Sequence, residues 1–169
     1  DAELIALKAQ INPHFIFNCL NNIRSLVLED PAKARDAITQ LSDLLRSSIQ
    51  FNQAESVTLA AELAVVRDYL ALESIHMEDR LQYSITIDPQ LETFEIPPMS
   101  IQLLVENAIK HSLAKRPEGG KVTVDIQRST TGVAIEVVNT GQLAAPARDS
   151  TGVGLRNLRE RLALISGPD

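Results

Sequence analysis

The chain has 169 residues, 44% of them hydrophobic, which suffices for one ordinary domain or for a small domain plus a helical segment. Its formal net charge of -6 argues against a nucleic-acid-binding protein, because such proteins usually present a basic patch. The single cysteine, Cys19, cannot form an internal disulfide, so the chain is compatible with a reducing compartment. No apolar run approaches membrane-spanning length and no signal peptide is visible. Both ends look cut, and we expect a fragment of a longer protein.

The first part of the sequence predicts helices. Apolar residues spaced by three and four predict a helix over about residues 4–28, which Pro13 should bend or begin. Asp30 and Pro31, an N-cap and a first-turn proline, begin a second helix that the segment 50–56 ends. Thr58 caps a third. The predicted apolar face of the second helix consists of Ala34, Ile38, Leu41, Leu45 and Ile49.

The short connection between the first two helices predicts an antiparallel hairpin. One hairpin cannot enclose a core alone, so we expect a homodimer in which two hairpins form a four-helix bundle.

The pattern changes near Asp79. Residues 81–88 alternate apolar and polar side chains, as a half-buried strand does, and the segment 96–100 opens a further helix. Residues 121–127 and 133–139 predict two strands joined by a hairpin turn. A loop over residues 141–154 leads into a last helix. The predicted fold class is therefore α+β, with a helical part over residues 1–78 and an α/β module over residues 79–169.

His14 lies where an apolar helix seam becomes polar. The seam of Leu4, Leu7 and Ile11 continues as His14, Asn18 and Asn21. Asn18 is one turn from His14, so the two side chains can meet. A neutral imidazole is a good nucleophile near neutral pH, and an adjacent amide could orient it. The alternative is a stray histidine on a helix surface. A metal site is a poor alternative, because no two histidines form an HxxxH pair.

A second polar constellation lies in "LLVENAIKHS", residues 103–112. Asn107, Lys110 and His111 share one helix face, with Glu106 beside it. A carboxamide oxygen can bind Mg²⁺, and the lysine and histidine suit phosphate charge. The alternative is a solvated polar face.

Two glycine elements follow. Gly141 comes directly after a predicted strand that ends in Asn139, and Gly152 and Gly154 precede the last helix. Glycines before a helix let backbone N–H groups approach a phosphate, although a short GxG is more often only a turn. The element is not a Walker P-loop, since the GK[ST] ending is absent, nor a Rossmann fingerprint, since no βαβ unit surrounds it.

Taken in this order, the motifs resemble those of LytS-type sensor histidine kinases over nearly the whole chain. "LKAQINPHFIFNCLNNI" resembles the histidine box of that family, and "IPPMSIQLLVENAIKHS" its N box. "VVNTG" and "GVGLRNLRERL" resemble its G1 and G2 boxes. The resemblance implies dimerization and histidine-phosphotransfer helices over residues 1–78. It implies a gyrase-type ATP-binding α/β sandwich, truncated at its C-terminus, over residues 79–169.

The resemblance also implies the chemistry. His14 would accept the γ-phosphoryl group of ATP, with Asn18 as a candidate orienting group. Asn107 would hold Mg²⁺, and Glu106 would assist through a metal-bound water. The other implied nucleotide-binding residues are Lys110, His111, Asn139, Gly141, Gly152, Gly154 and Leu155. The phosphoryl group would pass to an aspartate of a response regulator, often a DNA-binding protein. The full-length protein would sit in the inner membrane with this part in the cytoplasm.

Three departures from the family pattern bear on this function. Phe15 follows His14, where many other histidine kinases carry an acid that can act as base, so the destination of the proton is open. Asn139 replaces the usual aspartate that accepts a hydrogen bond from adenine, which should weaken that bond by about 1 kcal/mol. The chain ends where the family continues into further strands. The competing functions are a non-catalytic dimeric signalling scaffold with weak nucleotide binding, and a gyrase-type ATPase that would not need His14.

Overall fold

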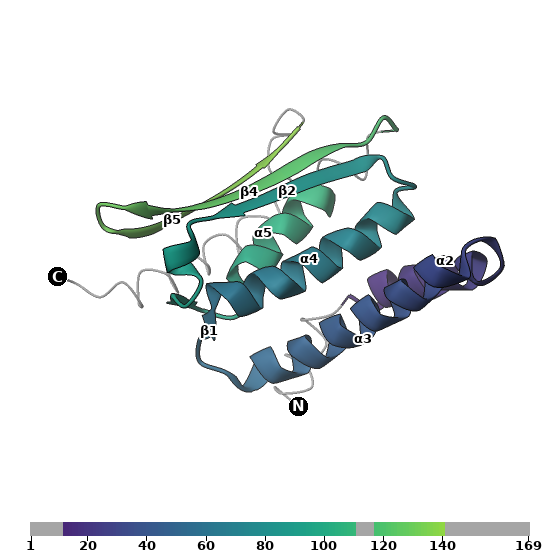
Figure 1. The fold of residues 1–169 in the computed structure, drawn as a ribbon, viewed down its shortest axis with the longest axis horizontal. Coiled ribbons are helices and arrows are strands. Elements are labelled where there is room, and N and C mark those ends of the chain that lie inside the picture. Colours follow the sequence, from purple (N-terminus) through teal and green to yellow (C-terminus); the bar gives the residue numbers. More distant parts are fainter. Residues whose placement is uncertain (1–11, 111–116, 141–169) are drawn as a thin grey trace, which may run out of the picture.

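The computed structural model describes residues 12–110 and 117–140. The α2–α3 hairpin, the pair of helices α4 and α5, and a sheet follow one another as three layers (Figure 1). The predicted α+β class is confirmed. None of the helices in these two ranges has the length and apolar character that crossing a bilayer requires.

Helix α2 (Pro13–Glu29) and helix α3 (Pro31–Gln53) form the predicted hairpin. Pro13 begins α2, and Asn12 caps it, because its side-chain Oδ1 accepts a hydrogen bond from the backbone N–H of His14 at 3.0 Å. Residues 4–11 of the predicted helix lie outside the described residues. The predicted cap of α3 is confirmed, since Asp30 accepts from the backbone N–H of Lys33 at 3.1 Å.

The apolar face predicted for α3 is only partly correct. Ala34 and Leu41 are buried, but Ile38 and Ile49 are 51% and 56% exposed. The buried face is rotated toward Ala37, Leu44, Ser48 and Phe51, because α3 packs against both α2 and α4. Sequence periodicity identified an amphipathic helix, but it could not separate the side chains that face this chain from those that face outward.

Helix α4 (Leu59–His76) begins at its predicted cap, where Thr58 Oγ1 accepts from the backbone N–H of Ala61 at 3.1 Å. Strand β1 (Val57–Thr58) precedes α4 and pairs with strand β3 (Glu95–Ile96) in an antiparallel ladder. The 3₁₀ turn η1 (Pro89–Leu91) lies before β3. A ladder of two residues leaves no detectable alternation in the sequence, so the sequence did not predict it.

The main sheet contains β2 (Leu81–Ile87), β4 (Gly120–Ser129) and β5 (Gly132–Asn139), in the order β2-β4-β5. The predicted hairpin is confirmed, because β4 and β5 pair antiparallel. Strand β2 runs parallel to β4, with Tyr83 opposite Val122. Helix α5 (Ser100–Ala108) lies between β3 and β4 along the chain and covers the same face of the sheet as α4 (Figure 1).

One hydrophobic core runs through the three layers, from Cys19 on α2 to Ile126 on β4. Side chains at alternate positions of β4 form the part of the core that belongs to the sheet. Side chains of α4 and α5 form the central part of the core. The fully buried side chains there include Leu59, Leu63, Val66, Leu70, Ile101, Val105, Val122 and Val124. The predicted division between residues 78 and 79 falls between α4 and β2, and this core crosses it. The division of the chain into residues 1–78 and 79–169 therefore stays a prediction, namely that these two parts move as separate units.

Candidate functional site

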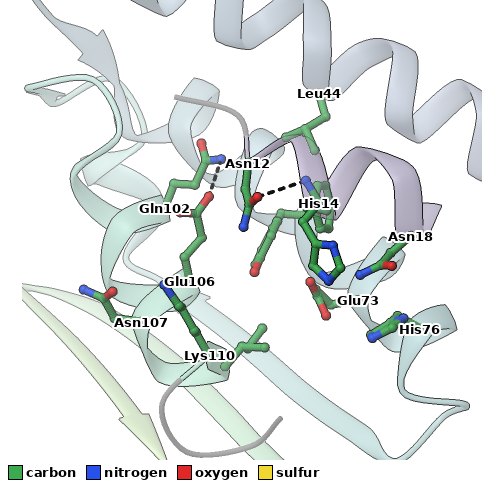
Figure 2. Close-up of a pocket in the computed structure, with 13 residues that line it drawn as sticks. Asn12, His14, Asn18, Leu44, Glu73, His76, Gln102, Glu106, Asn107 and Lys110 are labelled. Atoms are coloured by element: carbon green, nitrogen blue, oxygen red, sulfur yellow. Dashed lines mark hydrogen bonds between the residues drawn. The ribbon is translucent and has the colours of Figure 1, made fainter. Parts of the chain in front are cut away.

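A cleft of about 460 Å³ lies between α2, α4 and α5 (Figure 2). It brings together five residues that the sequence singled out in two separate motifs. They are His14 and Asn18 from α2, and Glu106, Asn107 and Lys110 from the end of α5 and the turn after it. Its volume lies within the usual range of small-molecule sites.

His14 stands in the first turn of α2, where Pro13 and the Asn12 cap fix the start of the helix. Its neighbour Phe15 packs against the ring of Tyr69 on α4, with centroids 5.1 Å apart and an interplanar angle of 37°. This contact ties the first turn of α2 to α4. His14 is exposed to solvent at the cleft, so a ligand can reach it.

Helix α5, which carries the other half of the cleft, is held by a carboxylate from α4. Met99 occupies the N-cap position with a left-handed backbone (φ 69°) and makes no side-chain cap. Glu62, which is fully buried, instead accepts backbone N–H bonds from Met99, Ile101 and Gln102 at 3.0–3.1 Å. A negative charge at a helix N-terminus also opposes the positive end of the helix dipole. Burial nevertheless raises the pKa of Glu62 above its usual value.

Glu106 is a half-buried acid that lines the cleft and has a shifted pKa. Burial raises its pKa from 4.5 to about 7, and nearby Glu73 adds to the rise, while a hydrogen bond from Gln102 opposes it. That bond runs from Gln102 Nε2 to Glu106 Oε1 at 3.1 Å. The Oε1 of Gln102 is buried without a hydrogen-bond partner. A polar atom of this kind usually has a reason, such as a ligand or water in the native state.

The cleft lining contains groups of the kind that bind Mg²⁺ and phosphate. The Asn107 carboxamide and the Glu106 carboxylate are oxygen donors of the kind that Mg²⁺ prefers. The exposed Lys110 ammonium can neutralise phosphate charge beside them.

Comparison with known proteins identifies the family. Residues 2–81 match the family described as "Histidine kinase". Over 99% of its length the chain is 37% identical to "Sensor protein LytS" of Staphylococcus saprophyticus and 36% identical to "Sensor protein LytS" of Bacillus subtilis. It is likewise 36% identical to "Sensor histidine kinase/phosphatase LytS" of Staphylococcus aureus.

This chain belongs to the LytS-type sensor histidine kinases. It spans about 30% of the length of these relatives. The matched region 2–81 contains His14 together with α2, α3 and α4.

The remaining residues that the family resemblance implies either do not line the cleft or lie outside the described residues. Asn139 ends β5 opposite Val122 and is not among the residues that line the cleft. The adjacent Thr140 closes the ladder, since its Oγ1 accepts from the backbone N–H of Lys121 at 2.9 Å. The other implied residues lie outside the described ranges: His111, Gly141, Gly152, Gly154 and Leu155.

The sequence did not indicate one side of the cleft. Tyr69, Glu73 and His76 line it from α4, and Gln102 lines it from α5. The three α4 residues are spaced by four and three, so they share one helix face, and that spacing was visible in the sequence. Nothing in the sequence indicated that this face would lie against α2 and α5.

Proposed function

We propose that this chain is the phosphoryl-transfer core of a two-component sensor. In this proposal it binds ATP with Mg²⁺, accepts the γ-phosphoryl group on His14, and passes it to an aspartate of a response regulator of the DNA-binding kind. The observation that supports this best is the shared cleft. The nucleophile candidate His14 and the phosphate-type residues Asn107 and Lys110 line one space, although they come from motifs far apart in the sequence.

The residues divide the work as phosphoryl transfer requires, mainly by positioning and charge neutralisation. Bound ATP–Mg²⁺ supplies the phosphoryl group and part of the charge neutralisation. Asn107 would hold the metal ion, Glu106 would assist through a metal-bound water, and Lys110 would face the phosphates. The imidazole of His14 would act as nucleophile, with Asn18 one turn away to orient it. On the family resemblance alone, we assign the rest of the nucleotide pocket to His111, Asn139, Gly141, Gly152, Gly154 and Leu155.

The proposed assembly is a homodimer paired through the α2–α3 hairpin. Large apolar side chains on both helices stay exposed in the single chain: Phe17 at 63%, Leu20 at 49%, Val27 at 51%, Leu28 at 91%, Ile38 at 51% and Ile49 at 56%. Such a concentration of exposed apolar residues is typical of an interaction surface. Pairing two hairpins would give the four-helix bundle expected from the sequence.

In the full-length protein we place this core on the cytoplasmic side of the inner membrane, with any membrane attachment through other segments. The lone, buried Cys19 suits a reducing compartment. No direct contact with nucleic acid is proposed, because the net charge is -6.

The test is incubation with γ-labelled ATP and Mg²⁺, followed by acid and base treatment. We expect label that survives base, is lost in acid and is absent from His14→Gln. His76→Gln is the matched control, because His76 also lines the cleft and should leave the label in place. Absence of label from the folded wild-type chain would favour the signalling scaffold. Hydrolysis of ATP without any label would favour the ATPase.

A further inference from the structure

The histidine box of this chain lacks an acid next to the phosphoacceptor, because Phe15 stands there. In the structure, Phe15 packs against α4 instead. Its ring lies on Tyr69, which is 7% exposed, and this contact brings α4 alongside the first turn of α2. The residues of α4 one turn beyond Tyr69 therefore reach the space around His14.

Glu73 is the residue at that place. It lies four residues after Tyr69, on the same face of α4, and lines the cleft together with His14. Figure 2 shows the Glu73 carboxylate directed to the side of the cleft where the imidazole ring of His14 and the amide of Asn18 lie. The side chain of Tyr69 interacts with the Glu73 carboxylate, and this interaction lowers the pKa of Glu73.

We propose that Glu73 positions the imidazole of His14 and receives its proton during phosphoryl transfer; this rests on the function proposed above. One ring nitrogen of His14 forms the N–P bond. The bond between the γ-phosphorus and its bridging oxygen breaks, and ADP leaves with the electron pair. The proton on the other ring nitrogen passes to a Glu73 oxygen, which leaves a neutral phosphoimidazole.

The surroundings of Glu73 suit a proton acceptor. Burial raises the pKa of Glu73 above its usual value, while the nearby side chains of His76 and Tyr69 act in the opposite direction. A base with a raised pKa accepts a proton more readily than an ordinary carboxylate. The titratable groups around Glu73 are His14 and Cys19 from α2, Tyr69 and His76 from α4, Glu106 from α5, and Lys110 just after α5.

The competing interpretation is that Glu73 only anchors Tyr69 and so supports the packing of α2 on α4. The two roles differ in what a substitution changes. Loss of an anchor disturbs nucleotide affinity and stability together with the rate. Loss of a proton acceptor lowers the rate with bound nucleotide and leaves the half-saturation constant for ATP unchanged.

The first experiment measures initial rates of His14 labelling in the full chain for wild type, Glu73→Gln and Glu78→Gln. Glu78→Gln is the matched control, because Glu78 follows α4, is exposed and does not line the cleft. We expect Glu73→Gln to lower the rate at saturating ATP by about 10²- to 10⁴-fold, as loss of a general base does. Its half-saturation constant should stay within about twofold of wild type. Glu78→Gln should label at the wild-type rate.

The second experiment needs no nucleotide. ¹⁵N NMR of histidine-labelled protein reports which ring nitrogen of His14 carries the proton. We expect a single tautomer in the wild type, because Glu73 accepts from one fixed nitrogen, and a mixture in Glu73→Leu. The signals of His76 provide an internal comparison.

A labelling rate of Glu73→Gln close to wild type would overturn the inference, and so would an unchanged His14 tautomer in Glu73→Leu. If Glu73→Gln fails to fold, Glu73→Asp replaces it in the experiment, because aspartate keeps the carboxylate. A folded Glu73→Asp variant that labels as slowly as His14→Gln would overturn the proposal. A wild-type chain without label would contradict the proposed function. The tautomer measurement would still decide whether Glu73 holds His14.

Discussion

The carboxylate of Glu62 on α4 accepts a hydrogen bond from the backbone N–H of Ile101, the second residue of α5, at 3.0 Å. The two residues are 39 positions apart in the sequence. Through this contact one buried side chain performs the capping that α5 lacks locally, and it fixes the helix that carries Asn107. The position of the cleft therefore depends on an interaction that no local sequence motif predicts.

Glu62→Ala should destabilise the protein by about 3 kcal/mol, because it leaves the backbone N–H groups of Met99, Ile101 and Gln102 buried without acceptors. Urea unfolding followed by circular dichroism measures this change. Glu55→Ala is the control, since Glu55 is exposed between α3 and β1, and it should shift the free energy of unfolding by less than about 0.5 kcal/mol. Equal effects of the two substitutions would contradict the capping role.

Glu106 should make stability depend on pH in the absence of nucleotide. Its pKa is raised in the folded state from 4.5 to about 7, so its contribution is fully present below pH 4.5 and is lost as pH rises through about 7. Glu106→Gln should remove that part of the slope, on the order of 1–3 kcal/mol between these limits. Unfolding at a series of pH values measures it. A wild-type slope unchanged by Glu106→Gln would show that other buried acids, such as Glu62 and Glu73, cause it.

Phe17→Glu should weaken dimerization without unfolding the chain. Phe17 is 63% exposed on α2, so the substitution leaves the core of one chain intact but places a charge on the proposed bundle surface. Sedimentation velocity at micromolar concentration should show a dimer for wild type and a monomer for the variant. Phe94→Glu is the matched control, because Phe94 is 42% exposed beside β3 and far along the chain from the hairpin. A monomeric wild type would contradict the predicted bundle.

Cys19 should resist thiol reagents in the folded protein. It is 3% exposed, and burial raises its pKa to about 12, with a further contribution from Glu73. Reagents attack the thiolate, so the native chain should react with a disulfide reagent at pH 8 at least about tenfold more slowly than the denatured chain. Absorbance of the released thiol measures both rates. Equal rates would show that α2 separates readily from α4.

Local signals in the sequence determined most of the secondary structure. Asp30 and Thr58 cap α3 and α4 as predicted, because capping depends on neighbouring backbone groups. Alternating side chains identified β2, β4 and β5, because strand burial has a period of two. The motifs around His14 and Asn107 likewise indicated the family and the residues of the candidate site.

Tertiary structure alone decided which of these pieces meet. The parallel pairing of β2 with β4, the short β1–β3 ladder and the anchoring of α5 by Glu62 all join segments distant in sequence. The same holds for Glu73 beside His14 and for the side of α3 that is buried. Periodicity shows that a helix has an apolar face, but the partner of that face depends on how all the elements share one core.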